Sequence, residues 1–144
     1  MRGDEITLKD CFPDGLYAPT DIFGIANCKI PANALADVCQ KLHFDLGFNY
    51  LADITAIDCQ DRIEVVYQLT NLSSNEKIAL RVDLDHETPV IDSVVSIWKG
   101  ADLQEREVYD LMGVVFSGHP NLTRILLPSD WEGYPLRKDY VIPD

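Results

Sequence analysis

The sequence predicts an α+β fold of two layers, in which helices cover one face of a mixed, mostly antiparallel sheet and an extended, irregular tail follows. Alternating apolar residues over 63–69 and again over 78–84 predict a hairpin with one apolar face. Apolar residues at helical spacing over 31–43 and 101–112 predict two helices that can cover this face. With 144 residues, the chain is long enough for one buried core.

The segment before the hairpin is predicted to hold a lead-in, a helix and a strand. Residues 1–26 contain several prolines and glycines among scattered acids, which favours an irregular lead-in. Pro31 suits the first position of the helix over 31–43, and Gly47 follows the end of that helix. Residues 51–57 indicate a strand, although the alternation there is imperfect.

The second helix is predicted over 101–112, with a short turn before it at 91–99 and Gly113 at its end. Its apolar stripe, which follows three-and-four spacing, consists of Trp98, Ala101, Val108 and Met112. Glu105 falls inside the stripe, and this position favours a buried ion-pair clamp around its neighbour Arg106. A short strand is predicted at 114–116.

The chain divides at residue 117 into an α+β domain over 1–117 and an extended partner-binding tail over 118–144. Prolines and glycines interrupt any helix or strand in the tail, yet the tail holds too many large apolar side chains for a disordered segment. Such a segment gains little by folding alone. We therefore expect it to lie on the surface of another protein.

Charge and composition narrow the classes of partner. The domain over 1–117 carries 20 acidic and 9 basic side chains, whereas the tail carries 4 and 3. This balance argues against nucleic acid as a partner and favours a solvated body with a covered tail. No run of about 18 apolar residues is present, so membrane contact is expected to be indirect. Without a recognisable secretion signal, the four cysteines are expected to be reduced.

Charged residues on and after the second helix suggest ion pairs. Arg106 lies four residues after Asp102 and four before Asp110, so both carboxylates could bracket it on one helix face. Two hypotheses stay open for Arg106, a buried clamp at a subunit joint and a solvated helix face. Arginines set among apolar residues, as Arg124 and Arg137 are, typically bind carboxylates or carbonyls of a partner.

Metal or catalytic chemistry is the alternative from a different class. Cys39 and His43 share a helix face, but Cys39 is better explained as a core residue. His119 indicates a turn or a partner contact. A free-standing metal-dependent hydrolase would have to use His119 with Asp110, or the acidic turn at 85–87.

Several short motifs follow one another between residues 105 and 140. They are Glu105-Arg106-Glu107, Tyr109-Asp110-Leu111-Met112-Gly113, Gly118-His119-Pro120, Arg124-Ile125-Leu126-Leu127-Pro128 and Leu136-Arg137-Lys138-Asp139-Tyr140. Together with Trp131 and Pro135, this series resembles the signature of the C subunit of respiratory complex I. The resemblance is strongest over 98–140 and is also in register over the preceding strand and hairpin.

The resemblance implies a two-layer α+β fold and a place in the peripheral arm of proton-pumping NADH:quinone oxidoreductase. It implies a structural subunit with no catalytic site, metal or cofactor of its own, because FMN, iron-sulfur clusters and quinone belong to other subunits. Members of the family bind the D subunit beside the quinone-reducing end of the peripheral arm, on the cytoplasmic face of the cell membrane. The equivalent subunit of an energy-converting nickel-iron hydrogenase, or of another complex I relative, is the alternative.

Carried onto this chain, the resemblance assigns a partner interface and a helix clamp. These residues are Glu105, Arg106, Asp110, Gly113, Gly118, His119, Pro120, Arg124, Leu126, Pro128, Trp131, Pro135, Arg137 and Lys138. Two positions depart from the family pattern. Leu103 stands where many members have tryptophan, and Thr123 stands where the family usually has a second arginine before Ile125. The missing arginine puts one partner contact in doubt.

Overall fold

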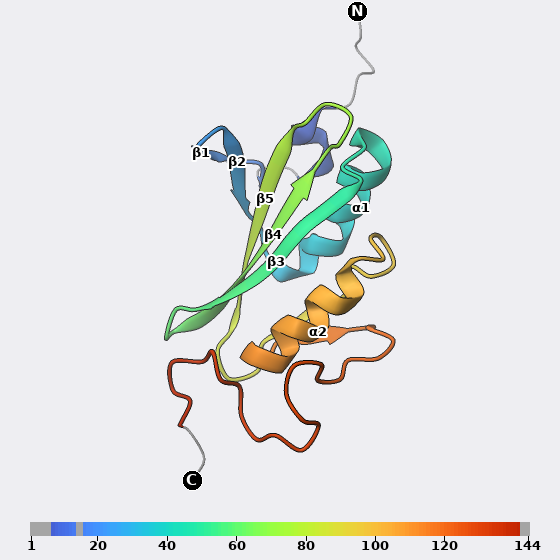
Figure 1. Cartoon of the computed structure of the whole chain (residues 1–144). Coiled ribbons are helices and arrows are strands. Elements are labelled where there is room, and N and C mark those ends of the chain that lie inside the picture. The colour runs from blue at the N-terminus through green and yellow to red at the C-terminus, as the bar shows by residue number, and fades with distance from the viewer. Residues whose placement is uncertain (1–6, 14–15, 142–144) are drawn as a thin grey trace, which may run out of the picture.

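The protein, seen here as a computed structural model that describes residues 7–13 and 16–141, has helices on one face of a five-stranded sheet (Figure 1). The strands are β1 (Thr20–Ile22), β2 (Ile25–Lys29), β3 (Tyr50–Asp58), β4 (Arg62–Thr70) and β5 (Lys77–Asp85). Their order is β1-β2-β5-β4-β3, in which β2 and β5 are parallel and the other neighbours antiparallel. The predicted fold class is confirmed.

The β4–β5 hairpin forms the centre of the sheet, as the alternation predicted. Ile63 pairs with Leu84 and Tyr67 with Leu80, so the apolar residues of both strands lie on the same face. These side chains are buried, and the helices cover them. The alternating pattern was decisive because a strand with one buried face must place an apolar side chain at every second residue.

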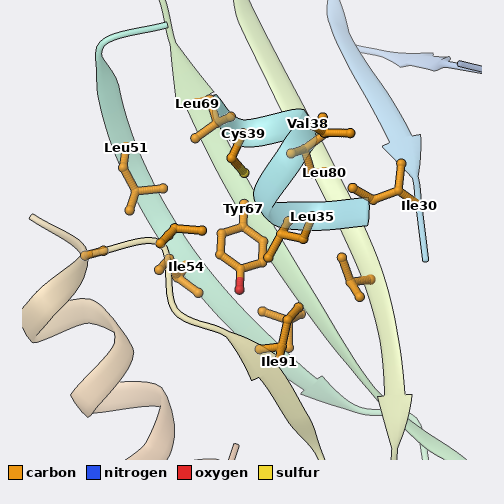
Figure 2. Close-up of a cluster of buried hydrophobic side chains, with 14 of the residues drawn as sticks. Ile30, Leu35, Val38, Cys39, Leu51, Ile54, Tyr67, Leu69, Leu80 and Ile91 are labelled. Atoms are coloured by element: carbon orange, nitrogen blue, oxygen red, sulfur yellow. The ribbon is translucent and has the colours of Figure 1, made fainter. Parts of the chain in front are cut away.

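The first helix, α1 (Leu35–Leu46), supplies the middle of the cover. Figure 2 shows α1 crossing the sheet, with Leu35 and Val38 directed towards Tyr67 and Leu80 of the hairpin. All four of these side chains are fully buried. This contact between helix and hairpin is the main apolar core of the domain.

The start of α1 differs from the prediction. Pro31 has φ −71° and ψ 153°, which is extended backbone, and a 3₁₀ turn at Ala32–Ala34 separates it from the helix. The helix therefore begins later than predicted, because proline at that position starts the 3₁₀ turn instead. The helix also runs to Leu46, beyond the predicted end at 43, and Gly47 follows it with φ 79°, as predicted.

The lead-in also contains more structure than predicted. A 3₁₀ turn (η1, Leu8–Cys11), strand β1 and the start of β2 fall within residues 1–26, although residues 1–6 and 14–15 lie outside the described part of the chain. The residues of β1 are all exposed, so they carry no burial pattern that sequence reasoning could detect. A two-residue turn at Phe23 and Gly24, both with positive φ, joins β1 to β2.

A compact βαβ unit follows the hairpin. The parallel strands β6 (Val90–Asp92) and β7 (Val115–Ser117) are joined through α2 (Ala101–Met112), which packs against β3. The bounds of α2 match the prediction, and Gly113 ends it with φ 78°. Strand β6 was missed because three residues, of which only Ile91 is buried, show too little alternation.

The tail contains no helix or strand between Gly118 and Val141, and residues 142–144 lie outside the described part of the chain. Figure 1 shows it running along the end of the molecule at which α2 terminates. Among the described residues, no helix is both long and apolar enough to cross a bilayer.

Candidate functional site

The tail caps the C-terminal end of α2. The last carbonyl groups of a helix have no partners within the helix, and here the tail supplies donors to three in a row. The bonds run from Arg124 Nη1 to the Asp110 carbonyl oxygen at 2.6 Å, from Leu136 N to the Leu111 oxygen at 3.0 Å and from Arg137 Nε to the Met112 oxygen at 2.6 Å. Both arginines also place positive charge at the negative end of the helix dipole.

The carboxylate of Asp110 is fully buried and binds the first half of the tail. Arg124 Nη1 donates to Oδ1 at 2.8 Å. Three successive backbone amides donate to Oδ2, those of Ile125 at 3.1 Å, Leu126 at 2.6 Å and Leu127 at 3.1 Å. Burial alone raises the pKa of Asp110, but the bonds from Arg124 and the amides outweigh it and lower this pKa below its ordinary value of 3.8.

The Tyr134 ring joins the two halves of the tail to the helix end. The guanidinium carbons of Arg124 and Arg137 lie 5.0 and 6.0 Å from the ring centre, within the range of cation–π attraction. A Cβ atom at Gly113 would lie 2.7 Å from the ring. Gly113 therefore ends α2 and also leaves the space that Tyr134 occupies.

A second buried carboxylate, Asp58 at the end of β3, binds the other half of the tail. Its oxygens accept hydrogen bonds from Lys138 N at 2.8 Å, Gln60 N at 2.8 Å and His86 Nε2 at 2.9 Å. Arg137 Nη1 donates to the His86 carbonyl oxygen at 2.8 Å. Burial alone raises the pKa of Asp58, whereas the three hydrogen bonds outweigh it and lower this pKa.

Glu105 connects α2 to the segment before it. Its side chain is fully buried. Ser93 Oγ donates to Oε1 at 2.5 Å and Val94 N donates to Oε2 at 2.8 Å. Burial raises the pKa of Glu105, and the bonds from Ser93 and Val94 only partly oppose this effect.

The predicted bracketing of Arg106 by two carboxylates does not form. Arg106 instead donates to the carbonyl and hydroxyl oxygens of Thr123, at 3.2 and 3.1 Å, in an exposed contact. The Asp110 carboxylate has other partners in the tail, and His119 binds the backbone carbonyl of Asp102. A pair at i,i+4 on a helix surface contributes only tenths of a kcal/mol, so the several tail donors around Asp110 prevail. The hypothesis of a buried Arg106 clamp is wrong.

His119 forms the predicted turn and is held on both sides of its ring. Nδ1 accepts a hydrogen bond from Asn121 N at 2.9 Å, so Nε2 carries the proton and donates to the Asp102 carbonyl oxygen at 3.1 Å. Its side chain is 0% exposed. Within the described residues no group of three or more His, Cys, Asp or Glu side chains could hold a metal ion. The geometry lends no support to the hydrolase hypothesis.

The tail arginines do not have the acceptors that were predicted for them. Arg124 and Arg137 bind carbonyl groups and a carboxylate of their own chain, where a partner's groups were expected. Of the other residues that the resemblance assigned, Gly118 is exposed with φ 86°, Pro135 is half-buried, and Pro120, Pro128 and Lys138 are exposed.

The polar groups of the tail are thus bound inside the chain, while many of its apolar side chains face outward. We call this set the apolar tail surface. It consists of Ile125 (37% exposed), Leu126 (57%), Trp131 (36%), Leu136 (60%) and Val141 (82%). Leu103 on α2 is also 60% exposed. Leu122 packs against the core and stays outside this set.

Sequence reasoning missed two residues that hold the tail, Asp58 and Tyr134. Asp58 lies 80 residues before Lys138, and no local pattern links them. Tyr134 was recognised only as one of many apolar tail residues. Its neighbours Gly113, Arg124 and Arg137 are all in the family signature, which was the one signal that could have pointed to it.

A family comparison bears directly on this arrangement. The model of the family described as "Respiratory-chain NADH dehydrogenase, 30 Kd subunit" matches residues 28–144, which include strands β3 to β7, both α-helices and the tail. The chain belongs to this family. The resemblance seen between residues 98 and 140 is therefore confirmed.

Curated relatives within the family agree. The C subunit of the NADH-quinone oxidoreductase of Moorella thermoacetica is 46% identical over 113 residues, which cover 77% of this chain and 76% of the relative. The same subunit of the enzyme from Roseiflexus sp. (strain RS-1) is 37% identical over 137 residues, which cover 92% of this chain and 79% of the relative.

Solved structures share the fold of this family member. The trypsin-resistant fragment (1-134) of Nqo5 matches with a TM-score of 0.63 and 33% identity, over 71% of this chain and 86% of the fragment. A chain of the membrane-bound sulfane sulfur reductase, an archaeal respiratory membrane complex, matches with a TM-score of 0.78, over 90% of this chain and 79% of that one. At 24% identity, the second match shows the fold alone.

Proposed function

We propose that this chain is a structural subunit, with no cofactor or catalytic site of its own, in the peripheral arm of an NADH-quinone oxidoreductase of the complex I type. Its tail binds the D subunit, which is its neighbour beside the quinone site. We call the D subunit the quinone-site partner. FMN, iron-sulfur clusters and quinone are held by other subunits. The complex lies on the cytoplasmic face of the cell membrane, and this chain contacts the membrane only through its partners.

One observation carries this proposal, the outward display of the apolar tail surface. Exposed apolar side chains that are arranged on a bound backbone mark a surface for another protein. The chain's own donors and acceptors already bind the polar groups beneath, so a partner needs to cover only the apolar side chains. The body is acidic and would stay solvated.

The electron donor of the complex is proposed from the relatives. Curated subunits that are 37 to 46% identical to this chain belong to NADH-quinone oxidoreductases, which supports NADH as the donor. The same fold occurs in the membrane-bound sulfane sulfur reductase, so fold alone does not distinguish between complexes. Donor chemistry would reside in the other subunits.

The proposal is tested by purifying a tagged form of this chain from its native membranes in mild detergent. We expect the chain to co-migrate with the quinone-site partner and with NADH-dependent quinone reduction. If the tagged chain is recovered without this partner and without that activity, the proposed function is wrong. Quinone reduction with another donor, but not with NADH, would contradict the choice of donor alone.

A matched pair of substitutions tests the role of the tail. Leu126→Ser changes a leucine that is 57% exposed in the tail, and Leu72→Ser changes one that is 61% exposed in the β4–β5 turn, outside the tail. We expect Leu126→Ser to lower the recovery of the quinone-site partner and Leu72→Ser to leave it unchanged. Neither should alter the melting temperature of the isolated chain by more than a few degrees. Equal recovery with both variants would contradict tail binding.

A further inference from the structure

The turn at 124–127 is organised around one carboxylate. Three consecutive amide groups, those of Ile125, Leu126 and Leu127, converge on Oδ2 of Asp110, while Arg124 binds Oδ1. Successive N–H groups that point into one concavity form an anion-binding nest, and bonds to a charged acceptor are stronger than neutral ones. In this protein the anion is a side chain of α2.

Apolar packing contributes little to this turn. Ile125 and Leu126 are 37 and 57% exposed, and Leu127 is only half-buried. No helix or strand includes these residues. The Asp110 carboxylate, which is fully buried on α2, is therefore the rigid element to which the turn is attached.

We infer that Asp110 is the positioning residue of the docking surface: its carboxylate holds the 124–127 turn in the conformation that the partner binds, before the partner arrives. The inference rests on the proposed function and adds how the surface is prepared. Because the turn is already ordered, association does not have to order it, and a preformed surface binds more tightly than one that folds on contact. Asp110 itself does not need to touch the partner.

Hydrogen exchange of the full-length isolated chain tests whether the turn is preformed. We expect the amides of residues 125–127 to be protected in the wild-type chain. In Asp110→Asn, which keeps the size of the side chain but removes its charge, they should exchange at least about tenfold faster. Asp130→Asn, at an exposed carboxylate of the same tail, is the matched control and should leave these amides unchanged.

Assembly provides the second readout. We expect Asp110→Asn to reduce binding of the quinone-site partner by about tenfold to a hundredfold in competition with wild-type chain, since the variant must order its turn on binding. Amides of β4 and β5 should keep their protection, which distinguishes loss of the turn from loss of the fold. Unchanged binding despite faster exchange at 125–127 would overturn the inference.

A second variant covers the case in which Asp110→Asn also unfolds the sheet. Arg124→Lys keeps the charge but cannot bind Asp110 and the Gly133 carbonyl oxygen together, as the arginine does. It should speed exchange at 125–127 by a smaller factor and leave the sheet protected. No change in exchange in Arg124→Lys would count against the inference.

Failure of the inference differs from failure of the proposed function. If the wild-type amides at 125–127 show no protection while Leu126→Ser still weakens binding of the quinone-site partner, the tail docks but is not preformed, and the inference is wrong. If these amides are protected through Asp110 but Leu126→Ser has no effect on binding, the turn is preformed for a surface that does not bind this partner. In that case the proposed binding of the tail to this partner is wrong, and the docking role of Asp110 is wrong with it.

Discussion

The domain and the tail of this protein are held in place by opposite means. In the domain, α1 and the β4–β5 hairpin bury apolar side chains such as Leu35, Tyr67 and Leu80 completely. In the tail, the contacts that hold the chain are mostly polar, and the side chains of the apolar tail surface are exposed. The carboxylates of Asp110 and Asp58 bind backbone amides of the tail, and the two tail arginines bind carbonyl groups at the end of α2.

This difference explains how an irregular apolar segment can have a defined conformation. Burial of apolar area stabilises a fold without direction, whereas charged hydrogen bonds fix particular groups at particular distances. The domain can therefore bury its apolar side chains in its own core. The tail can be ordered while its apolar side chains stay exposed to a partner. The contrast predicts that substitutions in the two regions will affect different measurements.

The largest effect is expected in the core. Leu80→Ala should lower the free energy of unfolding by about 2–5 kcal/mol, because it removes buried methyl groups and leaves a cavity between α1 and the hairpin. Urea unfolding of the isolated chain measures this change. Leu136→Ala, at a tail residue that is 60% exposed, is the control and should cost far less. Similar losses for both would remove the distinction between the two regions.

Gly113→Ala should have the next largest effect, because it acts where the two regions meet. A residue other than glycine in the left-handed conformation costs about 1–2 kcal/mol, and the new methyl group would also displace the Tyr134 ring. We expect lower stability together with faster proteolysis of the tail. Gly100→Ala is the control, since a Cβ there meets no atom within 4 Å. Equal behaviour of the two variants would refute the dual role of Gly113.

Acid should loosen the tail before it melts the core. The pKa values of Asp110 and Asp58 are lowered in the folded protein, so the stability that their carboxylates contribute is present above the ordinary value of 3.8. It is lost as the pH falls below 3.8, through the folded-state values. Amide exchange at residues 125–127 and at Lys138, followed from neutral pH downward, measures this release. If the tail amides stay protected from exchange after the sheet amides have lost their protection, these two carboxylates are not the groups that hold the tail.

The smallest effect is expected for Arg106→Ala. Because Arg106 makes only exposed contacts with Thr123, its removal should change the free energy of unfolding by no more than about 0.5 kcal/mol. Arg124→Ala is the comparison, because it leaves the buried Asp110 carboxylate without its cation and should cost clearly more than Arg106→Ala. Thermal or urea unfolding of both variants measures these two losses of stability. A loss of several kcal/mol for Arg106→Ala would support the hypothesis of a buried Arg106 clamp.

The parts of the fold that were predicted correctly all have a local cause. The hairpin follows from alternation, α2 from its three-and-four stripe, and the ends of both helices from Gly47 and Gly113, whose positive φ favours glycine. Strands β1 and β6 were missed because three-residue strands with at most one buried residue leave no pattern.

The site was predicted less well, because its contacts join residues that are distant in the sequence. Arg106 and its two neighbouring carboxylates satisfied the i,i+4 rule, yet Arg124, 14 positions from Asp110, binds that carboxylate, and Arg106 itself binds Thr123, 17 positions away. Arg124 and Arg137 were correctly singled out, but their acceptors were placed on another protein. Sequence spacing identifies groups that can bind, and it does not identify which acceptor comes within reach.

By itself, the sequence determined the layers of the fold and the family, because periodicity and a long ordered motif are properties of the chain alone. Only the tertiary structure decided how the tail is held. The end of α2 left three carbonyl groups and a buried carboxylate to be bound, and the tail's amides and arginines were the donors in reach. Hydrogen bonds require donor and acceptor to meet at about 3 Å, and that proximity arises only after the chain has folded.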